Sequence, residues 1–223
     1  MRTSALTSAL FGVLAAVQAQ EPGYDGYPTC IASTVPSNET ISFGRHYAVL
    51  NLDLINLLVS GVASTPAGSA WIGNVARWND AVHAQSPAPL SIFTRIYFTN
   101  SHQPEIGPSS PFAQVVWCES AADMNDSYAG AGNGLEEILR AQQIDTVILS
   151  GIRTSGVILS TAYRLFDLDY KVYVIANNTI ETPPNTPDIN TNILEGILPK
   201  LPIDVITIEQ ALAGLNNSGP AVY

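Results

Sequence analysis

The sequence predicts an α/β domain: a three-layer α/β/α sandwich around a mostly parallel, doubly wound sheet of about six strands. Two observations predict this fold. Short apolar runs alternate along the chain with segments whose apolar residues recur at helical spacing. The apolar runs are also continuous, which is typical of strands buried on both faces of a parallel sheet. The 223 residues are enough for one domain with a sizeable core.

The first 20 residues have the pattern of a secretory signal peptide. Arg2 supplies the positive start, Ala9–Val17 the apolar stretch, and Val17–Ala19 a small-residue cleavage signal. The apolar stretch is too short to span a bilayer, and no later segment reaches spanning length. We therefore expect residues 1–20 to be removed and the mature protein to be secreted, with no membrane partner.

The next segment, residues 21–43, is rich in Pro, Gly, Ser and Thr and is predicted to be an extended arm before a domain over 44–223. Export implies an oxidising environment, in which Cys30 and Cys118 either form a disulfide or each remain a buried thiol. Four Asn-X-Ser/Thr motifs are candidate glycosylation sites, at Asn38, Asn125, Asn177 and Asn216.

The elements of the first half follow from their apolar patterns. A continuous run with one Asn predicts a buried strand over 47–52, and a helix is predicted over 67–84. Residues 90–99 predict a second strand and residues 112–117 a short third one. The apolar residues at helical spacing in the first helix are Trp71, Ile72, Val75, Trp78 and Val82.

The second half continues the alternation. A helix from Gly134, with Leu135, Ile138 and Leu139 facing inward, leads into a strand that ends near Gly151. The following helix and the strand over 171–176 are succeeded by a helix, a strand and a last helix that close the chain. The stripe predicted on the helix after Gly151 consists of Val157, Thr161, Leu165 and Leu168.

Charge and residue spacing exclude several classes of function. Loss of the leader, which contains Arg2, takes the net charge from −10 to −11, which argues against nucleic acid as a partner. None of the three histidines pairs with another at ligand spacing, so no metal is expected. The glycines of 130–134 have the wrong spacing for a dinucleotide fingerprint, and we expect no cofactor.

In a doubly wound sheet, ligands bind beyond the carboxyl ends of the strands. Asp53 ends the first strand, where its carboxyl is a candidate general acid or base, or a cap for the helix that follows. Asn56 and His102 are predicted to contact substrate near it, although a surface-loop histidine is the simpler interpretation of His102.

The turn after the strand that ends at Gly151 is the third candidate segment. Its backbone N–H groups stand at the start of a helix, where they favour a negative oxygen; alternatively, a hydroxyl of the turn caps the helix. The turn is not a nucleophile elbow, because Arg153 stands where a glycine is needed, and Val157 replaces the lysine of a P-loop. The predicted substrate-binding residues are Arg153, Thr154, Ser155, Gly156 and Val157.

Two stretches, "AVLNLDLINLL" and "RAQQIDTVILSGIRTSGVILSTAYRLFDLDYKVYVIANN", resemble the isochorismatase-like, or cysteine hydrolase, superfamily over roughly residues 44–212. The resemblance implies a six-stranded parallel sheet and an Asp, a Lys and a Cys that together attack an amide carbon of a small molecule. It also implies a non-proline cis peptide at Ile152–Arg153 or next to it.

Carried over position by position, the family Asp falls on Asp53 and the family Cys on Val157. The family Lys is missing before the glycine-rich loop, and both lysines of the chain, Lys171 and Lys200, come too late. Residues 108–127 are shorter than the resemblance implies, through either a misread coding segment or genuine loss. Isochorismatases cleave a vinyl ether, and for them the cysteine is dispensable.

These features predict a secreted isochorismatase-like hydrolase that acts on a small anionic or amide metabolite without a cysteine nucleophile. The alternative is a catalytically inactive member of the family that binds a small ligand or another protein. A homo-oligomer is a further possibility that the sequence leaves open.

Overall fold

The computed structural model describes residues 32–95, 104, 106–109, 134–183 and 186–223. Over these residues it contains one fully parallel sheet of five strands in the order β2-β1-β3-β4-β5. The α/β sandwich predicted from the sequence is confirmed, while the predicted strand over 112–117 lies outside the described residues. The strands are β1 (Tyr47–Leu52), β2 (Leu90–Phe93), β3 (Thr146–Ile152), β4 (Lys171–Ile180) and β5 (Asp204–Ile206).

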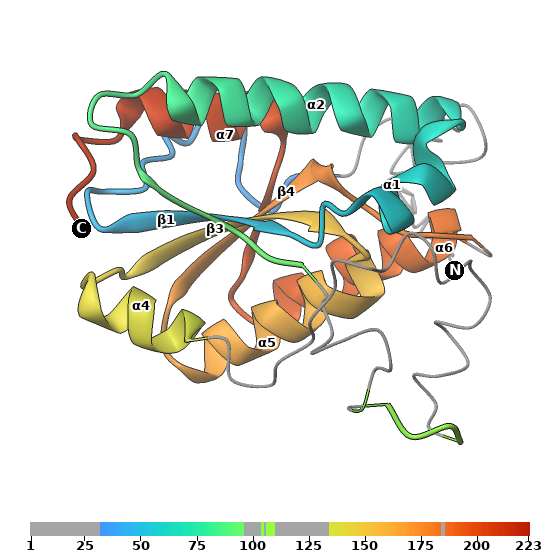
Figure 1. Ribbon diagram of the computed structural model, residues 1–223. Helices are drawn as coiled ribbons and strands as arrows, with labels where there is room; N and C mark the ends of the chain where they lie inside the picture. Colours follow the sequence, from blue (N-terminus) through green and yellow to red (C-terminus); the bar gives the residue numbers. More distant parts are fainter. Residues whose placement is uncertain (1–31, 96–103, 105, 110–133, 184–185) are drawn as a thin grey trace, which may run out of the picture.

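Helices cover both faces of the sheet (Figure 1). The long α2 (Pro66–His83) and α7 (Ile208–Asn217) lie on one face, and α4 (Leu135–Ala141) and α5 (Leu159–Asp167) lie on the other. The short α1 (Asn56–Ala63) connects β1 to α2. The π-helical turn η3 (Thr154–Ile158) leads into α5, and α6 (Thr186–Thr191), η4 (Asn192–Ile197) and η5 (Leu198–Lys200) connect β4 to β5.

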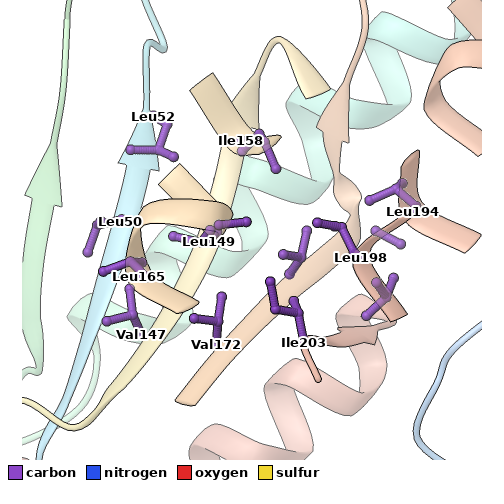
Figure 2. Packing of buried hydrophobic residues seen from close by; sticks show 14 of the residues in the cluster. Leu50, Leu52, Val147, Leu149, Ile158, Leu165, Val172, Leu194, Leu198 and Ile203 are labelled. Carbon is purple, nitrogen blue, oxygen red and sulfur yellow. The ribbon is translucent and has the colours of Figure 1, made fainter. Parts of the chain in front are cut away.

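Alternate residues of the central strands β1 and β3 point into two different hydrophobic cores, one on each face of the sheet. Leu50 and Leu149 point to the α4/α5 face, whereas Val49 and Ile148 point to the α2/α7 face. Figure 2 shows the first core, where Leu52 at the end of β1 and Ile158 of η3 lie at the same end of the sheet. Because both faces are covered, the strands are mainly apolar, with a few buried polar residues such as Asn51 and Ser150.

The amphipathic helices differ from their predicted patterns at a few positions. Trp71, Val75, Trp78 and Val82 of α2 are buried as predicted, but Ile72 is 38% exposed. Ile138 of α4 is likewise 42% exposed, beside the fully buried Leu139. Neighbouring helical residues point about 100° apart, so a residue next to the buried stripe turns toward solvent.

On α5 the buried stripe includes the predicted Leu165 but is shifted by one position before it. Ala162 and Leu165 are buried together with Ile158, whereas Val157, Thr161 and Leu168 are only partly buried. The π-helical turn at the start of this segment accounts for the shift, because it changes the angle between successive side chains.

The described part of the N-terminal segment packs against the far edge of the sheet. The Thr34 N–H donates to the Val205 carbonyl at 2.9 Å, and the Val205 N–H donates to the Thr34 hydroxyl at 2.9 Å. Val35, Ile41 and Phe43 are buried in the α2/α7 core. This segment therefore covers the edge of β5 that would otherwise expose unpaired backbone groups.

The C-terminal end of the chain returns to the start of β1 (Figure 1). The Val222 N–H donates to the Arg45 carbonyl at 2.8 Å, and the Tyr223 hydroxyl donates to the Ala88 carbonyl at 3.0 Å. Both contacts lie at the amino ends of β1 and β2. None of the helices in the described residues is long and apolar enough to cross a membrane.

Candidate functional site

The carboxyl ends of β1 and β3 form one edge of the sheet. Leu52 pairs with Gly151, and the next residues of the two chains are Asp53 and Ile152. Gly151 has φ +141°, and a Cβ there would lie 2.1 Å from the Leu52 carbonyl oxygen. Only glycine permits such a close approach of two backbones. The edge therefore brings together the chain after β1 and the turn after β3.

Asp53 is half-buried at this edge and has a left-handed backbone, with φ +54°. The Thr94 hydroxyl donates to Asp53 Oδ1 at 2.9 Å, and the Asp53 N–H donates to the Thr94 carbonyl at 3.2 Å. Burial raises the pKa of Asp53, and the hydrogen bond from Thr94 only partly opposes this rise. A carboxyl with a raised pKa is suited to carry a proton to a substrate.

The capping interpretation of Asp53 is wrong in this structure. The N-cap of α1 is Ile55, and no side chain accepts a hydrogen bond there. Asn56, the first residue of α1, is exposed and has the freedom to face a ligand. His102 lies outside the described residues.

The turn after β3 has the backbone that the resemblance implied, with a cis peptide between Ile152 and Arg153. The buried Thr154 hydroxyl donates to Asn190 Oδ1 in α6, which leaves it unsuited to contact a ligand. Ser155 and Gly156 are exposed, and Val157 is partly buried against the α4/α5 core. Of the five predicted residues, Thr154 is thus buried, Arg153 and Val157 are partly buried, and Ser155 and Gly156 are exposed.

Glu181, one residue after β4, is a site residue that the sequence analysis missed. Its side chain is only 1% exposed. Oε2 accepts a hydrogen bond from the Ser155 N–H at 2.7 Å, and Oε1 accepts from Arg153 Nε at 2.9 Å and from the Thr182 N–H at 2.9 Å. Strand β4 continues beyond the predicted residue 176 to Ile180, and this extension carries Glu181 to the ligand-binding edge.

The charge of Glu181 is stabilised by these donors. Burial alone would raise its pKa, but the hydrogen bonds from Ser155, Arg153 and Thr182 outweigh burial and hold the pKa below its ordinary value. Glu181 is therefore a buried carboxylate at neutral pH. The prediction that the turn offers its backbone N–H groups to a ligand is consequently wrong at Ser155, because the protein's own carboxylate takes that donor.

Neither lysine of the chain lies beside Asp53. Lys171 begins β4 at the opposite end of the sheet, where its ammonium pairs with Asp204, and Lys200 belongs to η5. Among the described residues, no group of three or more His, Cys, Asp or Glu side chains could hold a metal ion. Asp53, Arg153 and Glu181 are candidate site residues at this edge whose contacts the structure describes.

The described glycosylation candidates differ in accessibility. Asn38 and Asn216 are exposed. Asn177 lies within β4, where its side-chain oxygen accepts a hydrogen bond from the Ile208 N–H at 3.2 Å. Asn177 is thus held within the sheet, whereas Asn38 and Asn216 are accessible at the surface. Asn125, Cys30 and Cys118 lie outside the described residues.

Comparison with known proteins shows which family this chain resembles. Residues 47–209 match the family model described as Isochorismatase domain. An isochorismatase family protein from Burkholderia thailandensis shares 22% identity and a TM-score of 0.58, over 80% of this chain and 100% of the other. A cysteine hydrolase from Pseudomonas syringae pv. phaseolicola shares 14% identity and a TM-score of 0.64, over 81% of this chain and 99% of the other.

An N-carbamoylsarcosine amidase from Thermoplasma acidophilum shares 18% identity and a TM-score of 0.52, over 73% of this chain and 96% of the other. No curated protein matches the chain. At these identities the solved structures show a common fold and no more. The family model, however, spans well over half of the residues and includes both Asp53 and the turn after β3. The chain belongs to the Isochorismatase family.

Proposed function

We propose that this protein is a secreted hydrolase that acts on a small anionic or amide metabolite without a cysteine nucleophile. The observation that carries the proposal is Asp53: a half-buried carboxyl with a raised pKa, next to a turn in which Val157 occupies the position of the family cysteine. An aliphatic side chain cannot form a covalent intermediate, so the proposed reaction uses water directly.

In this reaction Asp53 exchanges a proton with the substrate. The protonated carboxyl donates its proton to the departing atom as the scissile bond breaks, and water adds to the other fragment. The proton that water loses restores the acid. Thr94 keeps the carboxyl oriented toward the edge through its 2.9 Å hydrogen bond. Positioning of this kind is the main contribution that a site without a nucleophile can make.

The experiment compares the wild type with Asp53→Asn on a panel that includes isochorismate, N-carbamoylsarcosine and simple primary amides. The matched control is Asp169→Asn, because Asp169 is also an aspartate with a left-handed backbone but precedes the amino end of β4. We expect Asp53→Asn to abolish hydrolysis and Asp169→Asn to retain it. Full activity of a folded Asp53→Asn variant would refute the acid role.

A second candidate is a family member that binds a ligand without turning it over. Glu181 favours it, because a buried internal carboxylate already fills the Ser155 donor that a reacting oxyanion could use. Retained binding of a panel compound, with no hydrolysis by the wild type at any pH, would establish this candidate instead.

Secretion is the part of the proposal that rests on the leader pattern alone. Expression in a eukaryotic host should release the protein into the medium with an N-terminus near Gln20, which mass spectrometry would identify. Full-length protein retained inside the cells would contradict it.

A further inference from the structure

We propose that Arg153 is the residue that selects the ligand, and that it recognises a carboxylate through the Nη1–Nη2 edge of its guanidinium. The inference rests on the proposed function only in placing the ligand at the edge beside Asp53. It goes further by naming the recognition group and the chemical class of the ligand.

Glu181 fixes the orientation of Arg153. The carboxylate is almost completely buried and accepts from Nε at 2.9 Å, while its other oxygen is held by the Ser155 N–H at 2.7 Å. A guanidinium is planar, so a bond at Nε sets the plane and direction of the whole group. Arg153 is therefore oriented before any ligand arrives.

The terminal edge of the same guanidinium remains available. An arginine has five N–H donors, and of those of Arg153 only Nε–H donates to Glu181. Within the part of the chain that the structure describes, no hydrogen bond or ion pair is formed by Nη1 or Nη2, and 42% of the Arg153 side chain is exposed. Among the described residues, the four N–H donors of Nη1 and Nη2 are thus left for a ligand.

The chemistry of that edge favours a carboxylate. Nη1 and Nη2 present parallel N–H groups whose spacing matches the two oxygens of a carboxylate, and such bidentate pairs are among the strong hydrogen bonds of proteins. A neutral amide can accept only one of these bonds. Glu181 balances the charge of Arg153. The preference for a carboxylate over an amide therefore depends on the hydrogen-bond pattern more than on net charge.

The position of Arg153 directs the ligand toward Asp53. Leu52 pairs with Gly151 at the end of the ladder; Asp53 follows Leu52 directly, and Arg153 is the second residue after Gly151. A ligand whose carboxylate binds Arg153 therefore extends its remaining atoms along the edge that contains the Asp53 carboxyl. The inferred substrate class is a small carboxylic acid with the scissile bond away from the carboxylate.

The test is a binding titration with benzoate, its neutral isostere benzamide, and inorganic phosphate, followed by NMR of the arginine Nε–H resonances. We expect benzoate to bind at least tenfold more tightly than benzamide and to shift the Arg153 Nε–H resonance. Arg153→Met should weaken benzoate binding at least tenfold, and Arg153→Lys should recover little of it, because an ammonium lacks the planar fork.

Because Arg153→Met removes the ion pair between Arg153 and Glu181, the double variant Arg153→Met/Glu181→Gln removes both charges of that pair and keeps an acceptor for Ser155. Loss of benzoate binding in either folded variant supports the inference. Unchanged binding in the double variant, equal binding of benzamide, or binding of phosphate alone would overturn it. Asp53→Asn separates the two proposals: lost turnover with intact benzoate binding supports both, whereas full turnover with intact Arg153-dependent binding refutes only the acid role.

Discussion

The buried carboxylate of Glu181 and the backbone N–H of Ser155 are joined by a 2.7 Å hydrogen bond. This bond ties the chain after β4 to the turn after β3. An anion from within the protein therefore occupies the position that a helix start commonly offers to a ligand. The recognition proposed for this edge therefore uses a side chain, that of Arg153, in place of the Ser155 N–H.

Glu181→Gln should destabilise the fold by about 2 kcal/mol at pH 7, because hydrogen bonds to a charged acceptor become weaker bonds to an amide. Glu209→Gln is the matched control: it breaks the ion pair with Arg77, whose partners are more than half exposed, and little change is expected. Urea unfolding of the three proteins measures both. Equal stabilities for all three would show that the Glu181 contacts contribute nothing.

The Glu181 contribution should also depend on pH. The pKa of Glu181 is below its ordinary value of 4.5 in the folded state, so its stabilisation is present above pH 4.5 and lost as the pH falls through the folded value. The wild type should therefore lose more stability than Glu181→Gln on acidification below pH 4.5. Parallel curves for the two proteins in this range would contradict the prediction.

Asp53 should have the opposite dependence. Its folded pKa lies above the ordinary value of 3.8, so the contribution of Asp53 is favourable below pH 3.8 and lost as the pH rises through the folded value. Asp53→Asn should consequently be as stable as the wild type or more stable at pH 7, while losing hydrolytic activity. Thermal unfolding at pH 7 and pH 4 measures this, and a large loss of stability at pH 7 alone would assign Asp53 a structural role.

Gly151→Ala should destabilise the protein by about 3 kcal/mol or more, because the added Cβ would overlap the Leu52 carbonyl oxygen and the backbone at φ +141° disfavours alanine. Gly73→Ala in α2 is the control, since a Cβ there meets no atom within 4 Å. The control should be neutral or stabilise the helix by up to about 1 kcal/mol. Chemical denaturation distinguishes the two outcomes.

The proposed mechanism assigns the position of the family nucleophile to Val157, so we expect thiol chemistry to contribute nothing to turnover. Alkylation of Cys30 and Cys118, or their joint replacement by serine, should leave the hydrolysis rate unchanged in protein that remains folded. A specific loss of rate in a folded Cys118→Ser variant would place a thiolate in the mechanism.

The fold could be predicted because its main determinants are local. The runs that form β1 and β3 are long and largely apolar, and α2 has four large buried apolar residues at regular spacing. The errors at Ile72 and Ile138 arise where an apolar residue flanks the buried stripe. No local pattern determines whether such a residue is covered by a neighbouring element.

The candidate site was predictable only in part. Asp53 and the turn around Arg153 follow from the rule that parallel strands bring their carboxyl ends to one edge. Glu181 could not be recognised because its partners, Arg153 and Ser155, are 28 and 26 residues away in sequence. A contact of that range depends on the length of β4, and the sequence pattern ended this strand at residue 176 instead of Ile180.

The return of the C-terminal end to Arg45 and Ala88 has a practical consequence for handling the protein. Those contacts lie at the amino ends of the strands, whereas Asp53 and Arg153 lie at the carboxyl ends. An affinity tag, a fluorophore or a sensor surface attached after Tyr223 would thus be separated from the ligand edge by the length of the sheet. Immobilisation through that end keeps the support away from the candidate site.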